Sequence, residues 1–505
     1  MRTSLRLGTV VYGSAVLFER LLGLLLLPVL ARALDRHDYG AWSQTAVAAA
    51  MLMPLVGFAL STAVVRSFSG ACGARDRRRA FALMAGVVAG LFVFASVAVL
   101  LARDPLALLI YGERAARSLL PAMLALLAAE VGVDFALAWL RTLGRIGVVA
   151  GVIAARSVLR VGTVLILVWS GPPHLAQWLG VYCAAQVVLM VTVFVLAVLL
   201  LRREAGPAAP VAVPRLAELL RFCAPLVVMA LFAQLNAYVD RFLLVPVLGL
   251  DGLAMYSAAV SLAGVPGAVY AILGFTLFPA LARHWHEDRR DAAAALTNRA
   301  LEVFVFLALP IALALALAGP TLLPLVAAAE YRAAPPVFAL LGVGVLAFGL
   351  YQITLYALLL DGRSRQVLAL TVGAALLNAV LNLWLAPRLG ASGAAAAAAL
   401  SNAALAAVAV HLAGATMPWR FPWQRIVPIV GRTALAALPL VAWVVWASWA
   451  AAATSATSVA SAAPAGASGV PAAVALVAAL AAGAALHLGL DLARPASVAR
   501  AMLAR

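Results

Sequence analysis

A chain of 505 residues that is 66% hydrophobic and 11% charged is too apolar to form the core and surface of a soluble protein. All 36 basic side chains are arginines, and the formal net charge of the chain is +17. Because lysine is absent, the sequence excludes a P-loop of the Gly-x-x-x-x-Gly-Lys type and ATP hydrolysis through that motif.

Fourteen apolar runs follow one another along the chain, and each is long enough to span a bilayer as a helix. No cleavage site of small residues follows the first run, so we expect a retained first helix and not a signal peptide. The predicted helices lie at residues 7–31, 42–65, 80–102, 118–140, 146–169, 175–201, 222–248, 252–282, 300–326, 336–360, 366–386, 391–415, 427–450 and 471–491. This pattern predicts an all-α integral membrane protein with 14 transmembrane helices.

The arginines are distributed unevenly between the gaps that separate these helices. Twenty-five fall before the first helix, in the second gap and every second gap after it, and after the last helix, a count that includes Arg432 near the start of the thirteenth helix. Seven fall in the other gaps, and four lie within helices. Since positively charged short loops face the cytoplasm, both termini are predicted to be cytoplasmic. The positive charge therefore indicates membrane topology, and we expect no nucleic-acid partner.

Two segments of low complexity divide the chain. Residues 204–215 are rich in alanine and proline and are predicted to form a cytoplasmic linker between two six-helix lobes, residues 1–203 and 216–415. The remaining segment, 416–505, would hold helices 13 and 14 with a cytoplasmic tail. A long Ala/Ser/Thr loop at 451–471 would join those two helices on the outer side.

The first and seventh predicted helices carry related sequences. Glu19 and Arg20 precede a Pro-Val-Leu triplet in the first helix, as Asp240 and Arg241 do in the seventh. Because each half has an even number of helices, both halves would enter the membrane in the same direction, which predicts a pseudo-twofold axis along the membrane normal. The match is short, and chance similarity is the alternative.

Several motifs in a fixed order carry a family resemblance. The first hairpin contains Arg20-Leu-Leu-Gly23, Pro28-Val-Leu-Ala-Arg32 and Asp38-Tyr39-Gly40, and later helices contain Phe278-Pro279-Ala-Leu281-Ala-Arg283, Asn378-Ala-Val-Leu-Asn382, Pro387-Arg-Leu-Gly390 and Gly393-Ala-Ala. With these motifs, residues 5–415 resemble the polysaccharide transport (O-antigen or oligosaccharide flippase-like) family of the multidrug/oligosaccharidyl-lipid/polysaccharide (MOP) exporter superfamily.

The resemblance implies a V-shaped pair of six-helix lobes around a central cavity. It also implies that the chain moves a polyprenyl-diphosphate-linked glycan from the inner to the outer leaflet by alternating access. Such a protein is a carrier and not an enzyme, and it needs no cofactor. Its partners would be the lipid-linked glycan, the lipid bilayer and other polysaccharide assembly proteins.

Four arginines within the predicted helices are candidate ligands for the diphosphate: Arg20, Arg241, Arg156 and Arg160. A guanidinium binds phosphate oxygens in pairs and stays charged when it is partly desolvated. Each one at mid-membrane costs roughly 2.5–3.5 kcal/mol on insertion scales, so each needs a partner or a purpose. Arg20 and Arg241 occupy matching places in the two repeats, which would put them across the cavity from each other.

Acidic residues within the same helices have two possible roles. Glu130 and Asp134, one turn apart in the fourth helix, are expected to face Arg156 and Arg160 in the fifth helix, with Glu130 and Arg156 at similar depth. The charges either neutralise one another and lock the two helices together, or a carboxylate exchanges protons and couples transport to the proton gradient. Glu19 and Asp240 are equal candidates for coupling, although each could instead balance the arginine next to it.

Amide side chains in the second half could line a path for the sugar or join helices by hydrogen bonds. The candidates are Asn236, Gln352, Asn378, Asn382 and Asn402. Asn378 and Asn382 share one helix face, and hydrogen bonding between helices is the role that membrane interiors favour for such amides.

Two other functions fit parts of the sequence. An exporter of drugs or lipids on the same scaffold would favour an aromatic, acidic pocket. The arginines within the predicted helices argue against this function. A membrane glycosyltransferase or polymerase would need a constellation of catalytic carboxylates or a large soluble loop, and the sequence has neither. The cysteines Cys72, Cys183 and Cys223 have no paired or metal-like spacing, so no metal site is expected.

Overall fold

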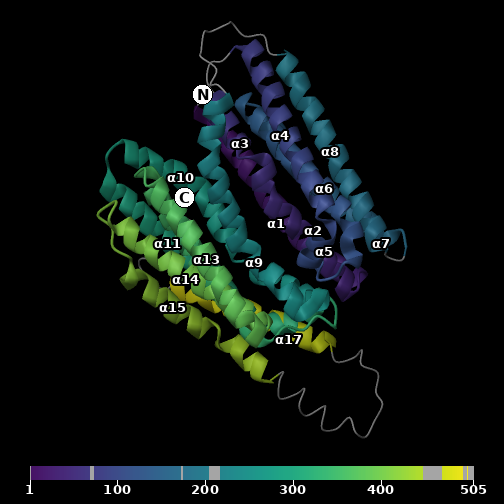
Figure 1. The fold of residues 1–505 in the computed structure, drawn as a ribbon. Helices are drawn as coiled ribbons and strands as arrows, with labels where there is room; N and C mark the ends of the chain where they lie inside the picture. Colours follow the sequence, from purple (N-terminus) through teal and green to yellow (C-terminus); the bar gives the residue numbers. More distant parts are fainter. Residues whose placement is uncertain are drawn as a thin grey trace. The chain divides into compact units, whose positions relative to one another are not determined.

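The computed structural model describes residues 2–68, 73–171, 174–203, 216–446, 469–492 and 498, and the regular structure of these residues is entirely helical (Figure 1). Among them, 12 helices are long and apolar enough to cross a membrane, or 13 if the bent pair α2 (Arg36–Gly57) and α3 (Leu60–Phe68) counts as one span. The predicted fold class, an all-α integral membrane protein, is confirmed.

The chain divides into two compact units, the first made of residues 1–258 and 375–390 and the second of residues 259–374 and 391–505. The predicted linker at 204–215 lies outside the described residues, and the division into lobes at that linker stays a prediction. The first unit contains α1 (Arg2–Ala33), α2, α3, α4 (Ala74–Leu101), α5 (Arg103–Tyr111), η1 (Ala115–Leu119), α6 (Leu120–Thr142), α7 (Ile146–Trp169), α8 (Leu175–Arg203), most of α9 (Leu216–Ala263) and the end of α13 (Ser364–Leu389).

Helix α6 is the central helix of the first unit. It packs against α2, α3 and α8, and most of its side chains are buried. The indole of Trp139 is fully buried near the C-terminal end of α6, and its ring centroid lies 5.2 Å from that of Phe68 and 5.5 Å from that of Phe81. Such aromatic pairs contribute stability beyond the area that they bury. Helix α1 packs along α7 in the same unit, so helices far apart in the sequence lie side by side.

The predicted helix at 42–65 is broken into α2 and α3, which meet at an angle of 44°. The break falls at Phe58 and Ala59, whose φ angles are +46° and +51°. This left-handed conformation is unfavourable for side chains with a Cβ atom. The backbone N–H of Phe58 donates to the carbonyl of Pro54 at 3.1 Å, which closes the last turn of α2.

Replacing Ala59 with glycine is expected to raise the free energy of unfolding by about 0.5–1 kcal/mol. Glycine removes the cost of the left-handed conformation, and part of that gain is offset because glycine loses more chain entropy on folding. Thermal unfolding in detergent, followed by circular dichroism, measures the change. Ala63→Gly in helical α3 is the matched control and should be destabilised, and an Ala59→Gly variant destabilised to the same extent would contradict the assigned strain.

The second unit contains the end of α9, α10 (Gly267–His286), α11 (Arg290–Val326), α12 (Pro335–Leu360), the start of α13, α14 (Ala391–Gly414), α15 (Trp423–Ala436) and α17 (Gly469–Leu492). Helix α9 joins two predicted helices across a kink at Gly249, where φ is +66° and ψ is −177°. Turns at residues 264–266 then interrupt the predicted helix at 252–282. These joints explain why fewer separate spans are found than the 14 predicted.

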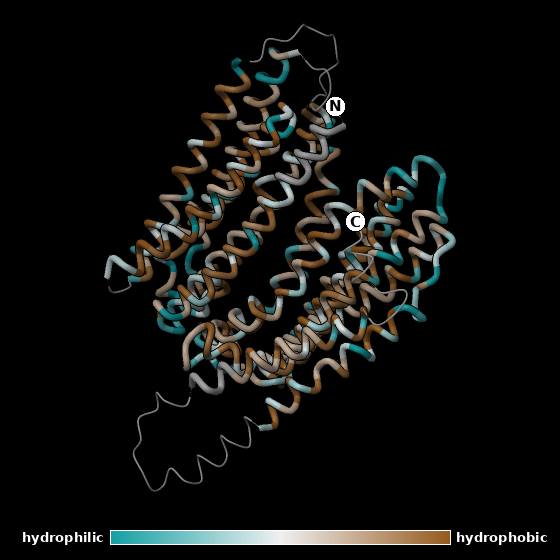
Figure 2. The backbone as a smooth tube through the Cα atoms, turned by 180° about the vertical axis from the view of Figure 1, so that it is seen from behind, coloured by the Kyte–Doolittle hydropathy of each residue, from teal (hydrophilic) through white to brown (hydrophobic). Residues whose placement is uncertain are grey.

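Helices α12 and α14 pack closely in the second unit because small residues form their contact. A Cβ atom on Gly344 would lie 3.5 Å from the backbone of Ala399. The pairing of α12 with α14 corresponds to that of α6 with α8, which are the fourth and sixth predicted helices of the other half. A repeated six-helix unit would give this shared pairing, and the twofold relation stays a prediction. Figure 2 shows apolar residues running along the helices, with hydrophilic residues mainly at their ends.

Candidate functional site

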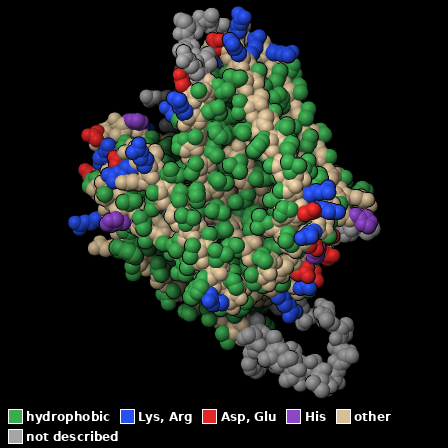
Figure 3. All heavy atoms as spheres, viewed as in Figure 1, with side chains coloured by type: hydrophobic (Ala, Val, Ile, Leu, Met, Phe, Trp, Pro, Cys, Tyr) green, Lys and Arg blue, Asp and Glu red, His purple; other side chains and the backbone are tan. Residues whose placement is uncertain are grey.

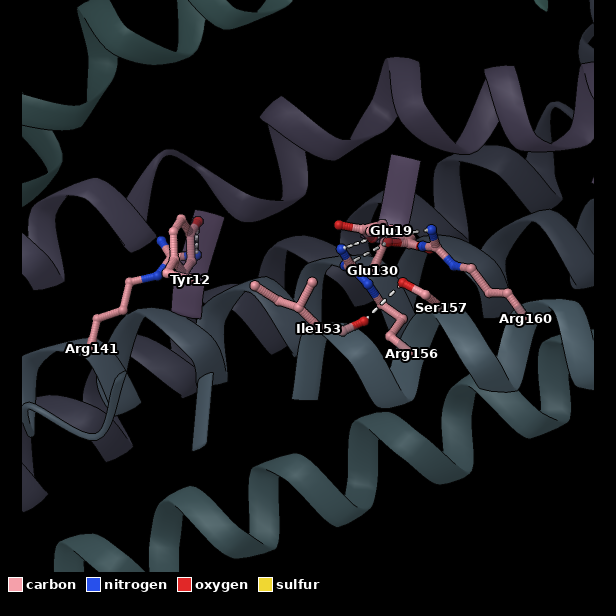
Figure 4. A network of polar contacts seen from close by, with 8 residues as sticks. All are labelled: Tyr12, Glu19, Glu130, Arg141, Ile153, Arg156, Ser157 and Arg160. Atoms are coloured by element: carbon pink, nitrogen blue, oxygen red, sulfur yellow. Dashed lines mark hydrogen bonds and ion pairs between the residues drawn. The ribbon is translucent and has the colours of Figure 1, made fainter. Parts of the chain in front are cut away.

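Four charged side chains meet in the first unit, from three different helices (Figure 4). Glu19 lies on α1, Glu130 on α6, and Arg156 and Arg160 lie one turn apart on α7. Arg156 pairs with Glu19 and, with 3.5 Å between Nη1 and Oε2, with Glu130. Arg160 pairs with Glu130 and, with 3.6 Å between Nη1 and Oε1, with Glu19. Each guanidinium therefore contacts both carboxylates.

This four-charge cluster is formally neutral and largely shielded, because each of its side chains is only 17–23% exposed. Its position follows from the packing of α1 along α7, which places Glu19 beside the arginine pair. Removing one charge would leave the others uncompensated at low dielectric, which is costly. The carboxylates already engage both guanidinium groups, so a phosphate would have to displace a carboxylate to bind here.

The cluster differs from the predicted one in a single carboxylate. Glu130 and Arg156 do pair, as their depths predicted, but Asp134 does not contact either arginine of α7. The hydroxyl of Ser61 on α3 donates to Asp134 Oδ2 at 2.6 Å instead. Because α3 packs against α6, this hydroxyl is the polar group that Asp134 reaches, and Glu19 takes the predicted place of Asp134.

Arg20 and Arg241 are placed differently from the arginines of α7. The side chain of Arg20 is exposed on α1, next to Glu19 in sequence, while Glu19 pairs with α7. The guanidinium of Arg241 lies over the ring of Tyr238, 5.3 Å from its centroid. Within the described part of the chain neither arginine forms an ion pair, so Glu19 does not balance Arg20. Both guanidinium groups remain available to an anion.

Asp240 is buried on α9 and is held by two hydrogen bonds. The hydroxyl of Tyr256 donates to its Oδ2 at 2.6 Å, and the backbone N–H of Arg241 donates to its Oδ1 at 2.8 Å. Tyr256 lies beyond the kink at Gly249, so this bond joins the two arms of α9. Asp240 thus interacts with the backbone of Arg241 and makes no ion pair with its side chain.

Asn378, one of the predicted amides, connects α13 to α9 within the first unit, and Asn382 bonds to it within α13. Asn378 Nδ2 donates to the carbonyl of Asn236 at 2.9 Å, and Asn382 Nδ2 donates to Asn378 Oδ1 at 2.8 Å. Both Asn378 and Asn382 are buried. This geometry is the helix contact that membrane interiors favour. Gln352 on α12 and Asn402 on α14 are partly buried in the second unit.

Sequence reasoning missed a buried ion pair in the second unit. Arg432 on α15 pairs with Asp491 on α17, and both side chains are buried. The count of 25 arginines on the cytoplasmic side includes Arg432, but the structure places this residue inside α15, where it is buried. His487 on α17 donates from Nε2 to the carbonyl of Phe306 at 3.1 Å, which ties α17 to α11. The only advance signal was that Arg432 and Asp491 each fell within a predicted helix.

A second missed pairing lies in the first half of α11. Glu302 is buried and accepts from Arg299 Nη1 at 2.9 Å and from Arg425 Nη1 at 2.8 Å. Arg425 belongs to α15, so the carboxylate joins the two helices. Among the described residues, no group of three or more His, Cys, Asp or Glu side chains is placed to hold a metal ion.

Comparison with known proteins places this geometry in context. The sequence profile of the family described as "Polysaccharide biosynthesis protein" matches residues 5–285. No curated protein sequence matches the chain. The structure of the lipid II flippase MurJ in an inward closed conformation matches with a TM-score of 0.73 and 12% identity, covering 98% of this chain and 100% of that chain.

Two transporters of the MOP superfamily have a similar fold. An inward-facing multidrug resistance MATE family transporter matches with a TM-score of 0.60 and 15% identity, covering 79% of this chain and 94% of that chain. A MOP superfamily transporter from Pyrococcus furiosus matches with a TM-score of 0.54 and 12% identity, covering 81% of this chain and 95% of that chain. At these identities the likeness concerns the fold alone.

Proposed function

This chain belongs to the polysaccharide biosynthesis protein family of the MOP exporter superfamily, and from that premise we propose that it is a flippase. Its substrate is a polyprenyl-diphosphate-linked oligosaccharide, which it moves from the inner to the outer leaflet for surface polysaccharide biosynthesis. It works by alternating access in the bacterial cytoplasmic membrane, with both termini in the cytoplasm, and other polysaccharide assembly proteins are its partners. The match to a lipid II flippase over the whole chain supports a lipid-linked substrate.

The observation that carries this function is that the four intramembrane arginines differ in whether a carboxylate pairs with them. The arginines of α7 are engaged by two glutamates, whereas Arg20 and Arg241 have no carboxylate partner among the described residues. An uncompensated guanidinium in a membrane-spanning helix is costly unless it serves a ligand. Arg20 and Arg241 are therefore the phosphate ligands that we propose, and Arg156 and Arg160 become available only when a glutamate is released.

The same cluster supplies the candidate for ion coupling. If Glu130 or Glu19 takes up a proton, its attraction to the guanidinium groups is lost and an arginine is freed for the diphosphate. Protonation and substrate binding would then favour each other at one site. Asp240 is a weaker candidate for this exchange, because Tyr256 and the backbone of Arg241 already use both of its oxygens.

Export of an amphipathic drug or lipid by the same scaffold is the second candidate, and the fold shared with a multidrug transporter favours it. The arginine pair separates the two candidates, since a cationic drug would be repelled by Arg20 and Arg241 while a diphosphate would be bound. Binding of a soluble diphosphate analogue, absent from a variant that lacks both arginines, would exclude a site built for cations.

Replacing Arg241 with glutamine is expected to slow flipping by about tenfold or more, because charge-assisted hydrogen bonds to phosphate are lost. The measurement uses proteoliposomes with a fluorescent polyprenyl-diphosphate oligosaccharide, whose outer fraction is read by an added glycosidase. Arg241→Lys should restore part of the rate, since lysine keeps the charge without the bidentate geometry. Arg117→Gln is the control, because Arg117 is exposed and pairs with Asp104 at 3.1 Å. Wild-type flipping by a folded Arg20→Gln/Arg241→Gln variant would overturn the assignment.

A further inference from the structure

An apolar groove of about 380 Å³ lies between helices of the first unit, away from the charged cluster. Helix α4 lines it with one face, including Ala85, Ala89 and Phe92, and α6 lines it with Ala128 and Gly132 at a matching spacing. The remaining walls come from α8 and α2, and every lining residue is apolar. Small residues on α4 and α6 leave the space, since larger side chains at these helical positions would fill it.

Aromatic residues close one end of the groove. The ring centroid of Phe81 on α4 lies 5.5 Å from that of Phe135 and 5.1 Å from that of Phe194 on α8. The side of the groove is open between α4 and α8, where Val191 and Val195 are about half exposed. Because these helices span the membrane, the medium at this opening is lipid hydrocarbon. A lipid chain can enter sideways, and water has no polar partner there.

The depth of the groove identifies the leaflet. The apolar part of α4 runs from Ala80 to Leu101 and is about 32 Å long, which matches a hydrocarbon core of about 30 Å. Ala85 and Phe92 lie about 8 and 18 Å along α4 from Ala80. The groove therefore occupies the leaflet at the arginine-rich end and reaches just past the midplane. In the predicted orientation this is the cytoplasmic leaflet.

Exposed arginines gather where α4 begins and α8 ends. Arg78 connects these ends, since its Nε and Nη2 donate to the carbonyls of Leu201 and Arg202 at 3.0 and 2.8 Å. Four other arginines around this junction have exposed side chains: Arg75, Arg79, Arg202 and Arg203. Figure 3 shows basic side chains over the end of the first unit where α4 and α8 terminate. Arg79 lies about 9 Å along α4 from Ala85, so phosphate groups at the membrane surface would meet positive charge near one end of the groove.

We propose that an anionic phospholipid of the cytoplasmic leaflet binds at this α4–α8 site. One acyl chain fills the groove, and its phosphate lies among the exposed arginines at the ends of α4 and α8. The depth favours a phospholipid over a polyprenyl chain, because a groove that ends just past the midplane fits a chain one leaflet long. The bound chain would complete the packing of α4, whose apolar stretch is the least buried of the candidate spans.

Photolabelling tests the site in the intact protein. The chain is reconstituted in phosphatidylcholine nanodiscs with a small fraction of phosphatidylglycerol that carries a diazirine midway along one acyl chain. After irradiation, labelled peptides are mapped by mass spectrometry. We expect labels on α4 and α6 at the groove. The variant Arg75→Gln/Arg79→Gln should reduce this labelling by about tenfold, whereas Arg145→Gln, at an exposed arginine on the same side of the membrane, should leave it unchanged.

Two further experiments distinguish the contribution of the acyl chain from that of the headgroup. A phosphatidylcholine probe with the same diazirine chain should label the groove weakly and should not respond to the arginine variant. Ala89→Phe fills the groove and should remove labelling by the phosphatidylglycerol probe, whereas Val93→Phe, at an exposed position of the same helix, should not. Equal labelling by both probes, labels spread over all lipid-facing helices, or displacement of phosphatidylglycerol from the groove by polyprenyl diphosphate would overturn the proposal.

Discussion

Replacing Glu130 with glutamine is expected to lower the free energy of unfolding by about 3 kcal/mol, because two guanidinium groups would then share one carboxylate. Glu130 contacts both arginines of α7, so the neutral amide weakens two ion pairs at once. The cluster would carry an uncompensated positive charge within membrane-spanning helices, where water screens it less than at an exposed surface. Thermal unfolding in detergent and in nanodiscs measures the change.

An exposed ion pair of the same unit supplies the control. Arg117 and Asp104 are 3.1 Å apart, but both side chains are about half exposed, so Asp104→Asn should change stability by about 1 kcal/mol or less. The double variant Glu130→Gln/Arg160→Gln removes one charge of each sign and should be less destabilised than the sum of its single variants. Equal losses in Glu130→Gln and Asp104→Asn would show that the cluster does not hold α1, α6 and α7 together.

Transport by the same variant separates the two roles of the cluster. If Glu130 exchanges protons, Glu130→Gln should flip substrate at a rate that no longer responds to a proton gradient imposed across the vesicle membrane. If the cluster only locks helices, flipping should fall in proportion to the loss of folded protein and should keep its response. The amount of folded protein in each vesicle preparation is therefore measured alongside the rate.

Replacing Asp491 with asparagine is expected to cost about 3–5 kcal/mol, because it leaves the buried guanidinium of Arg432 without its carboxylate. The remaining bond of Arg432, from Nε to the carbonyl of Pro428 at 2.9 Å, stays within α15 and cannot hold α17. We expect α17 to separate from α15 before the rest of the chain unfolds. Hydrogen exchange of α17 peptides, followed by mass spectrometry, measures this local opening.

Replacing both residues of the pair with apolar ones distinguishes the cost of an unpaired charge from the cost of lost packing. Arg432→Leu/Asp491→Leu removes both charges and keeps apolar volume, so its stability should lie close to that of the unchanged protein. His487 and Thr433, 3.4 Å apart, would remain to align the two helices. Fast exchange of α17 in the leucine pair, as fast as in Asp491→Asn, would contradict a cost that arises from the unpaired charge.

The length and type of the helices could be predicted because an apolar run long enough for the bilayer permits few alternatives to a helix. The joints within the helices could not. Phe58 and Ala59 carry no sequence signal for the left-handed conformation that separates α2 from α3, since glycine usually occupies such positions. At Gly249 the glycine was visible, but many membrane helices tolerate glycine without a kink.

The candidate site was predictable where its residues belong to one hairpin. Glu130 and Arg156 lie on consecutive helices, so counting residues from the connecting loop gave their depth. Glu19 was missed as their partner because the packing of α1 along α7 joins helices that are not neighbours in sequence. The same reason hid the pair of Arg432 and Asp491, which are 59 residues apart on helices whose contact the sequence does not specify.

The first compact unit is made of two separate segments of the chain, and this limits how the gene can be divided. This unit takes residues 375–390 from the middle of the second half, so one cut in the polypeptide cannot release either unit intact. A split at the alanine- and proline-rich segment would leave residues 216–258 on the wrong fragment. Fragments encoded separately, or fusions that exchange halves between homologues, would have to reassemble α9 and α13 in trans before the first unit could form.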